Sequence, residues 1–289
     1  MTSRIDYNNP VSSGKLGLPY HYEMVSDSKR VTPFKLAIQA TCKDKRVFES
    51  GIGSGIMSIL AAKAGAKKVY ATEIDSDIAD FAQENINKNG FQNVIKILRK
   101  DTRNVSIEDI EGEKVDVAIA ENLSTWEVNE PEIAVFNHIN ENLLKADGVR
   151  IPEIIYNYFE LANSQYIFED SVELRTYYFQ FTGIPSPEIL SDKTLFSEID
   201  LRKTNLKKTE KSVVVKILKS GVLNSLRLTS PLKVFSDIAF DSSDSLMPPV
   251  IIPLKKDIEV KVGNKVKLDI KYNFENGWNN FKCEATLVQ

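Results

Sequence analysis

The chain has 289 residues, of which 42% are hydrophobic and 27% charged, and its formal net charge is −3. This length and composition predict an ordinary globular protein of about two domains, and the slightly acidic balance argues against a nucleic-acid partner. Cys42 and Cys283 are the only cysteines and form no CxxC pair, so neither a disulfide framework nor a metal centre is expected. The N-terminus lacks an apolar signal core, and no run approaches the roughly 18 apolar residues of a membrane span. We therefore expect a cytoplasmic enzyme with no membrane partner.

Residues 1–18 contain Asn-Pro and Ser-Ser-Gly breakers, which predict a flexible N-terminal arm. From about residue 45 to residue 121, short apolar runs alternate with helical patterns. The expected strands span 46–48, 68–72, 94–98 and 115–120, and the expected helices span 56–64 and 75–89. This alternation predicts a Rossmann-like domain over residues 19–152, with a mostly parallel sheet and helices on both faces. Ligands bind such sheets at the carboxyl ends of the strands.

A glycine-rich turn follows the first expected strand. Gly51, Gly53 and Gly55 stand at every second position, and Glu73 ends the next strand, 22 residues after Gly51. The glycines let a ligand approach bare backbone beside a helix N-terminus, and an acid placed like Glu73 binds ribose hydroxyls in such folds. The dinucleotide fingerprint has its third glycine one residue later, where this chain has Ile56, so a pyrophosphate-binding turn is disfavoured. A turn without a ligand would explain the glycines but not Glu73, so we expect a nucleoside cofactor.

Acidic residues also gather at the strand ends. Asp101 and Glu121 follow the third and fourth expected strands, so they share one edge of the sheet with Gly51 and Glu73. Glu121 and Glu130 lie nine residues apart on the loop that leaves this edge, where two carboxylates could hold a cation. The loop carries four acids, and loop acids are usually solvated, so the pair alone is a weak indication. Trp126, between them, could stack on a cationic or aromatic acceptor, although we expect it to anchor the loop in the core.

The sequence pattern changes after residue 152. Residues 153–289 contain short alternating runs separated by Gly-Asn and Asn-Gly turns, which predict antiparallel strands. The expected fold class is therefore α/β, a Rossmann-like domain followed by an antiparallel β-barrel or sandwich. Residues 165–204 fit neither pattern. Val172–Thr182 and the region around Pro187 are helical candidates there, and the stretch could form an arm.

Several segments together resemble the protein arginine N-methyltransferase family, whose members are class I methyltransferases that use S-adenosylmethionine. The G-x-G-x-G turn followed by Glu73 is similar to the cofactor loop of that class. Glu121 and Glu130 match the spacing of the family's double-Glu loop, and Leu143–Pro152 resembles its L-x-P-G-G-x-x-x-P turn. Residues matching the family's H-x-x-M-L-x-D-x-x-R segment are His21, Met24, Asp27 and Arg30. The resemblance runs from about residue 19 to the end of the chain and is more specific in its first half.

The resemblance implies a site for S-adenosylmethionine and an acceptor site beside it. The cofactor residues would be His21 and Met24 on the lid, Arg30 on the cofactor carboxylate, Gly51, Gly53 and Gly55 in the turn, Glu73 on the ribose, Asp101 at the adenine, and Glu49 at the ammonium group or behind Arg30. Glu121 and Glu130 would be the catalytic pair that holds a guanidinium and orients the nitrogen to be methylated. Members of the family usually form head-to-tail dimers, which implies a homodimer joined through an arm near 165–204.

Departures from the family pattern keep other acceptors open. Ser245-Leu246-Met247 stands where the family has Thr-His-Trp in the barrel, Asn122-Leu123-Ser124 replaces Trp-Met-Gly after the first glutamate, and Arg103 replaces an acid near the adenine. The expected function is methyl transfer to a guanidino nitrogen of a protein. The alternatives are a small-molecule N- or O-methyltransferase on the same scaffold, acting on a guanidino or amine substrate, and a catalytically silent binding subunit.

Overall fold

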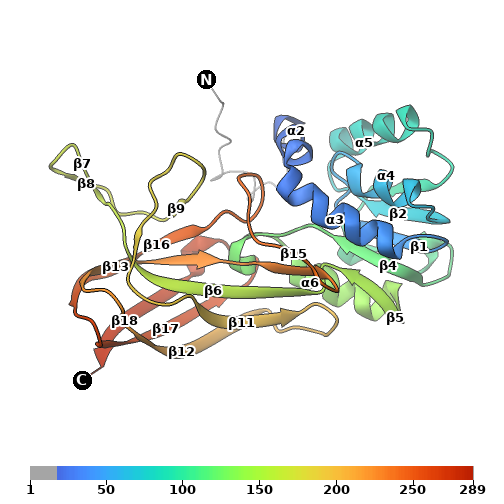
Figure 1. The fold of residues 1–289 in the computed structure, drawn as a ribbon. Helices are drawn as coiled ribbons and strands as arrows, with labels where there is room; N and C mark the ends of the chain where they lie inside the picture. The colour runs from blue at the N-terminus through green and yellow to red at the C-terminus, as the bar shows by residue number, and fades with distance from the viewer. Residues whose placement is uncertain (1–17, 289) are drawn as a thin grey trace.

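The computed structural model describes residues 18–288, so nearly all of the expected N-terminal arm lies outside the described residues. The first half of the protein is a five-stranded parallel sheet in the order β3-β2-β1-β4-β5 (Figure 1). Its strands are β1 (Arg46–Ser50), β2 (Lys68–Thr72), β3 (Ile95–Leu98), β4 (Val115–Ala120) and β5 (Leu144–Ile151). Val47 of β1 lies between Val69 of β2 and Val117 of β4, and all three are buried. Such apolar central strands suit a sheet that is covered on both faces.

Helices provide that cover. The helix α4 (Ile56–Lys63) contacts β1, β2 and β3, and α6 (Glu132–His138) contacts β4. Figure 1 shows α3, α4 and α5 on one side of the sheet and α6 on the other. The remaining helices and single turns are α2 (Leu18–Ser26), α3 (Ser28–Thr41), α5 (Ser76–Lys88), η1 (Thr102–Asn104), η2 (Glu108–Ile110), η3 (Thr125–Glu127), η4 (Ile139–Leu143) and η5 (Trp278–Asn280). Because the strand–helix connections are short, the ends of β1, β2 and β4 meet at one edge.

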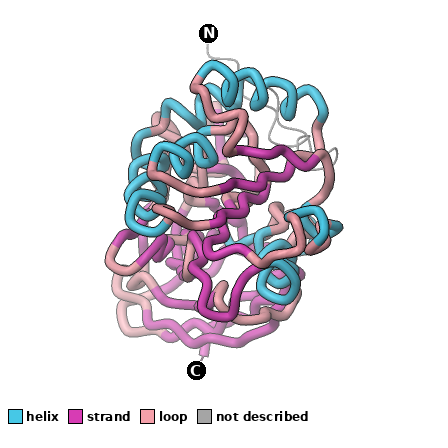
Figure 2. Tube along the Cα trace, turned by 90° about the vertical axis from the view of Figure 1, so that its right-hand side faces the viewer, coloured by secondary structure: helices cyan, strands magenta, loops and turns pink. Residues whose placement is uncertain are grey.

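The second half is antiparallel and curls into a half barrel, so the expected fold class is confirmed. One sheet has the order β15-β14-β6-β13-β16-β9 with β10 and β11 also paired to β6, and another has the order β12-β17-β18. Its strands are β6 (Ile154–Asn163), β7 (Ile167–Phe168), β8 (Val172–Glu173), β9 (Tyr178–Phe179), β10 (Glu188–Ile189), β11 (Thr194–Asp200), β12 (Lys208–Lys216), β13 (Gly221–Thr229), β14 (Leu232–Phe235), β15 (Ile238–Phe240), β16 (Val250–Val260), β17 (Lys265–Asn273) and β18 (Lys282–Val288). In Figure 2 helices lie at the upper end, along the left side and at the lower right, and strands dominate the lower end, where the C-terminus lies.

The expectation of a helix over Val172–Thr182 is wrong. This stretch contains β8 and β9, and β10 begins just after Pro187. Tyr178 and Phe179 pair with Ile251 and Val250 at the start of β16. Aromatic residues favour strands when a sheet edge is available, and a partner strand some 70 residues away leaves no local periodicity to read.

The loop between β4 and α6 fastens the two halves together. Trp126 on this loop is fully buried, stacks on Phe196 with 4.7 Å between the ring centroids, and donates its Nε1–H to the carbonyl of Tyr158 at 3.1 Å. The backbone N–H of Glu275 donates to the carbonyl of Glu127 at 3.0 Å. The loop that carries the candidate catalytic pair is therefore anchored in the barrel. No helix within residues 18–288 is long and apolar enough to cross a membrane.

Candidate active site

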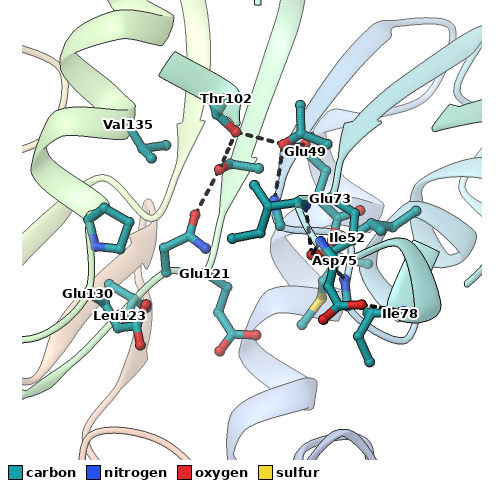
Figure 3. Close-up of a pocket in the computed structure, with 18 of the residues that line it drawn as sticks. Glu49, Ile52, Glu73, Asp75, Ile78, Thr102, Glu121, Leu123, Glu130 and Val135 are labelled. Carbon is teal, nitrogen blue, oxygen red and sulfur yellow. Dashed lines mark hydrogen bonds between the residues drawn. The ribbon is translucent and has the colours of Figure 1, made fainter. Parts of the chain in front are cut away.

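A cavity of about 400 Å³ opens at the carboxyl edge of the parallel sheet (Figure 3). It is bounded by the first loop after β1, the ends of β2 and β4, helix α2 and two turns of the barrel. Ten of the eleven residues that the sequence singles out line it: His21, Met24, Arg30, Glu49, Gly51, Gly53, Glu73, Asp101, Glu121 and Glu130. The exception is Gly55. It caps α4 with a φ of 87° and faces the backbone of Ala82, so it serves the turn and the helix packing rather than the cavity.

The first loop leaves no room for a side chain at Gly51 or Gly53. Gly51 and Gly53 have φ values of 71° and 51°, and a Cβ on Gly53 would lie 3.0 Å from Cε1 of His21. Beside this loop, the carboxylate of Glu73 accepts hydrogen bonds from the backbone N–H groups of Gly53 at 3.2 Å and of Ile74 and Asp75 at 2.9 and 3.0 Å. An ionised carboxylate has about four acceptor positions, so one stays available to a hydroxyl of a ligand.

Arg30 is almost completely buried, with 3% of its side chain exposed, and pairs with Glu121. Its Nε donates to Oε1 of Glu121 at 2.9 Å and its Nη2 donates to Oε2, while Nη1 donates to the carbonyl of Met24 at 3.3 Å. Asp27 caps α3 and accepts the backbone N–H of Arg30, which fixes where the arginine leaves the helix. Arg30 therefore contacts Glu121 in addition to lining the cavity.

Burial dominates the electrostatics of the acids. It raises the pKa of Glu49 to about 8, with the hydroxyl of Ser58 donating to its carboxylate. Burial, reinforced by the charge of Glu121, raises the pKa of Glu130 to about 7. The pKa of Glu121 is also raised by burial, although Arg30 opposes the shift. The carboxylate of Glu130 has no hydrogen-bond or ion-pair partner within residues 18–288, so it is the acid most ready to receive a cation.

The other two acids of the loop are not solvated, contrary to what is usual for a loop. Glu127 and Glu132 are fully buried. Glu127 accepts the side-chain N–H of Asn157 at 2.8 Å, and burial raises its pKa to about 8. Glu132 accepts the backbone N–H of Asn122 at 3.1 Å. Both residues stabilise the loop from inside. Glu127 does so through its contact with Asn157 of the barrel and Glu132 through its bond to Asn122, and the local sequence shows neither contact.

Sequence reasoning also missed several residues that line the cavity. They are Ser50, Thr72, Thr102, Asn122 and Leu246, together with Glu275 from the barrel. Thr72 ends an expected strand, and Ser50 and Asn122 lie two residues beyond the ends of two others, which was the signal available. Asp101 pairs with Arg103, whose guanidinium holds the pKa of that carboxyl below its usual range.

The charged and polar groups that line the cavity suit a cationic nucleoside. Glu49 is set aside because its raised pKa keeps it protonated at neutral pH; even so, carboxylates outnumber cations along the lining, with Glu73, Asp75, Asp101, Glu121, Glu130 and Glu275 against Arg30, Lys100 and Arg103. The bare backbone of Gly51 and Gly53 forms a cradle that a Cβ would fill, and Glu73 keeps an acceptor position for a ribose hydroxyl. Arg30 retains N–H groups beyond its three bonds, since a guanidinium has five. These residues fit S-adenosylmethionine.

Comparisons with known proteins agree on the class. A family model described as ribosomal protein L11 methyltransferase matches residues 35–149. An uncharacterized protein of Methanocaldococcus jannaschii is 33% identical over 257 residues, which cover 88% of this chain and 91% of that protein. The arginine N(omega)-methyltransferase of Streptomyces achromogenes subsp. streptozoticus is 24% identical over 93% of this chain and 78% of its own length. A chain of the Trypanosoma brucei PRMT1 enzyme–prozyme heterotetrameric complex with AdoHcy superposes with a TM-score of 0.76 at 18% identity, covering 97% of this chain and all of that one.

Proposed function

This chain belongs to the methyltransferases that resemble protein arginine N-methyltransferases, and we propose that it methylates a guanidino nitrogen held by Glu121 and Glu130. It is an S-adenosylmethionine-dependent methyltransferase. The cofactor supplies a methyl group on a sulfonium, and the protein has to align the acceptor nitrogen with that methyl. The observation that carries the acceptor assignment is that two largely buried glutamates from one loop line the cavity, where Arg30 pairs with Glu121 and nothing in residues 18–288 pairs with the carboxylate of Glu130.

A guanidinium is a poor nucleophile because its lone pairs are delocalised and it stays protonated. Glu121 can bind its planar fork with both oxygens, and Glu130 can contact the nitrogen that is to be methylated. Together the two carboxylates draw positive charge away from that nitrogen and fix its direction. In a buried pocket such charge stabilisation is worth far more than at the surface.

The Arg30–Glu121 pair supports this role for Glu121. Arg30 donates through Nε and Nη2 to the two carboxylate oxygens, the two-point geometry that recognises a guanidinium. Glu121 thus presents the fork-binding face of a carboxylate within the cavity. Arg30 would share it with the acceptor, or turn its remaining N–H groups to the cofactor carboxylate.

A second candidate acceptor is a free guanidino compound such as arginine rather than a protein. One observation favours it: the Streptomyces relative named as an arginine N(omega)-methyltransferase matches along 93% of this chain. The test is to incubate the protein with methyl-labelled cofactor and, separately, free arginine, an arginine-containing peptide and a matched lysine peptide. Label on arginine or its peptide supports the guanidino assignment and separates the two candidates. Label on the lysine peptide alone would contradict both.

The acceptor step is expected to depend on the ionisation of Glu130. Below about pH 7 this carboxyl is protonated and neutral, so it binds a cation weakly; above that pH it is ionised. We therefore expect kcat/KM for the acceptor to rise by about tenfold per pH unit on the acid side and to level off above the pKa. Because the charge of Glu121 raises the pKa of Glu130, the apparent value belongs to the pair. The variant Glu130→Gln should have lower kcat/KM and a flatter profile; a profile of unchanged shape would assign the ionisation elsewhere.

We also propose that the chain forms a homodimer through the hairpin β7–β8. This hairpin projects from the barrel (Figure 1) and exposes Ile167, Phe168, Val172 and Leu174. Apolar side chains gathered on a projecting element indicate an interaction surface. Changing Phe168 and Leu174 together to Glu should convert a dimer to a monomer in sedimentation. An unchanged sedimentation coefficient in the double variant would remove the hairpin from the interface.

A further inference from the structure

A chain of buried hydroxyl groups runs beneath the cofactor loop (Figure 3). The Oγ1 atoms of Thr72 and Thr102 are 2.6 Å apart, Thr102 Oγ1 is 2.7 Å from Ser50 Oγ, and Ser50 donates to Oδ1 of Asn122 at 2.8 Å. All three hydroxyl residues are buried. The chain thus links the ends of β2, β1 and β4, and its four members all line the cavity. The methyl transfer proposed for Glu121 and Glu130 does not use this hydroxyl chain.

The hydrogen bonds of this chain run in one direction. A hydroxyl has one proton, and an amide oxygen only accepts. Since Ser50 donates to Asn122, it must accept from Thr102, and Thr102 must in turn accept from Thr72. Thr72 then accepts the backbone N–H of Gly51 at 3.3 Å. The opposite direction would end on the carbonyl of Glu49, 3.5 Å from Thr72 Oγ1, which is a poor hydrogen bond.

Asn122 is the terminal acceptor of this chain, which holds its side-chain amide in place. Its backbone N–H is held by Glu132 at 3.1 Å, and its Oδ1 is held by Ser50. Nδ2 therefore faces the other way, toward Gly51, and lies 2.8 Å from the place that a Cβ on Gly51 would occupy. Within residues 18–288 no group accepts a hydrogen bond from Nδ2. Nδ2 of Asn122 is thus a fixed donor that faces the backbone of Gly51, against which a ligand would lie.

We propose that Asn122 is a cofactor-binding residue whose Nδ2 donates to an acceptor atom of the cofactor portion that lies against Gly51. Ser50, Thr72 and Thr102 are positioning residues, because they hold the amide with its donor toward the ligand. Hydrogen-bonded chains of this kind strengthen one another when buried. The inference requires only that the protein binds its nucleoside cofactor and is independent of the acceptor's identity.

The direct test is the variant Asn122→Asp, with S-adenosylhomocysteine binding measured by calorimetry. Aspartate keeps the size and the acceptor for Ser50 but replaces the donor by a carboxylate oxygen. We expect affinity to fall by about tenfold, the effect of losing one hydrogen bond to a ligand and facing it with an acceptor. Asn87→Asp, the same charge change on the exposed face of α5, is the matched control and should bind like the parent. Parent-like affinity for Asn122→Asp would overturn the proposal.

The positioning role is tested by Thr102→Val in two backgrounds. In the parent it should weaken binding by about threefold, because the amide is then free to turn. In Asn122→Ala it should have no further effect, since no amide remains to be oriented. Equal losses in both backgrounds would show that Thr102 acts only through local packing. Thermal unfolding without ligand, recorded for every variant, separates loss of binding from loss of folded protein.

Discussion

Replacing Glu121 by glutamine is expected to lower turnover by about 10²–10³-fold, the usual effect of removing one preorganised electrostatic group from a buried active site. Glutamine keeps the size of the side chain but can no longer draw charge from a guanidinium. Affinity for S-adenosylhomocysteine should not fall, because Arg30, released from Glu121, can give its N–H groups to the cofactor carboxylate. Turnover with saturating cofactor and cofactor affinity by calorimetry check the two expectations separately.

The matched control is Glu84→Gln, which removes the same charge from the exposed surface of α5. It should change neither quantity, since surface ion pairs contribute little. Glu121→Gln also leaves Arg30 buried with fewer partners, so the assays belong well below the unfolding midpoint of the variant. Unchanged turnover would remove Glu121 from the acceptor site. A loss of cofactor affinity as large as the loss of turnover would reassign it to the cofactor site.

The sequence predicts what is decided locally. The parallel sheet follows from apolar runs separated by helical patterns, and α4 and α5 end within two residues of the expected positions. The cavity follows from topology, because parallel strands with short connections bring their carboxyl ends to one edge. The alternation of strands and helices along the chain was therefore enough to predict that Gly51, Glu73 and Glu121 lie at the same edge of the sheet.

Contacts between distant residues could not be predicted. Arg30 meets Glu121 across 91 positions, and the hydrogen-bonded pairs of the hydroxyl chain are 30, 52 and 72 residues apart. Glu127 and Glu132 read as solvated loop acids because nothing nearby in sequence shows that the barrel closes over them. The strands in 165–204 depend on sheet edges built from residues up to 251. In each case the sequence does not show which distant residue or strand of the same chain makes the contact.

Burial of the loop acids has a physical consequence for the site. Glu127 and Glu132 are both supported by single hydrogen bonds from Asn157 and Asn122, and both have pKa values raised by burial. Held protonated, they add no charge that would compete with Glu121 and Glu130 for a cation. The loop can therefore carry four acids while only two of them, Glu121 and Glu130, line the cavity.

Trp126 determines how firmly that loop is held. It is fully buried against Phe196, Tyr272 and Phe281, and its backbone N–H donates to Ser230 Oγ at 2.8 Å. Trp126→Ala is expected to lower the free energy of unfolding by about 3–5 kcal/mol, as for other large buried aromatic side chains. At temperatures where the variant is still folded, turnover should fall too, because the loop that carries both glutamates has lost its anchor.

The backbone of Trp126 gives a second expectation with an unusual sign. Its φ of 59° lies in the left-handed region, which costs about 1 kcal/mol for a residue with a Cβ. Trp126→Gly should therefore be at least as stable as Trp126→Ala, although glycine is ordinarily the less stable of the two.

Trp278→Ala, which removes a ring from the same aromatic cluster on the barrel side, is the control for the anchoring role of Trp126. It should lose stability but keep more turnover per folded molecule. Chemical denaturation of the three variants, with turnover normalised to folded protein, decides the matter. If Trp126→Gly unfolds more easily than Trp126→Ala, the backbone at Trp126 is not strained. If Trp278→Ala loses as much turnover as Trp126→Ala, the whole aromatic cluster supports the site, and Trp126 has no special role as the anchor of the loop.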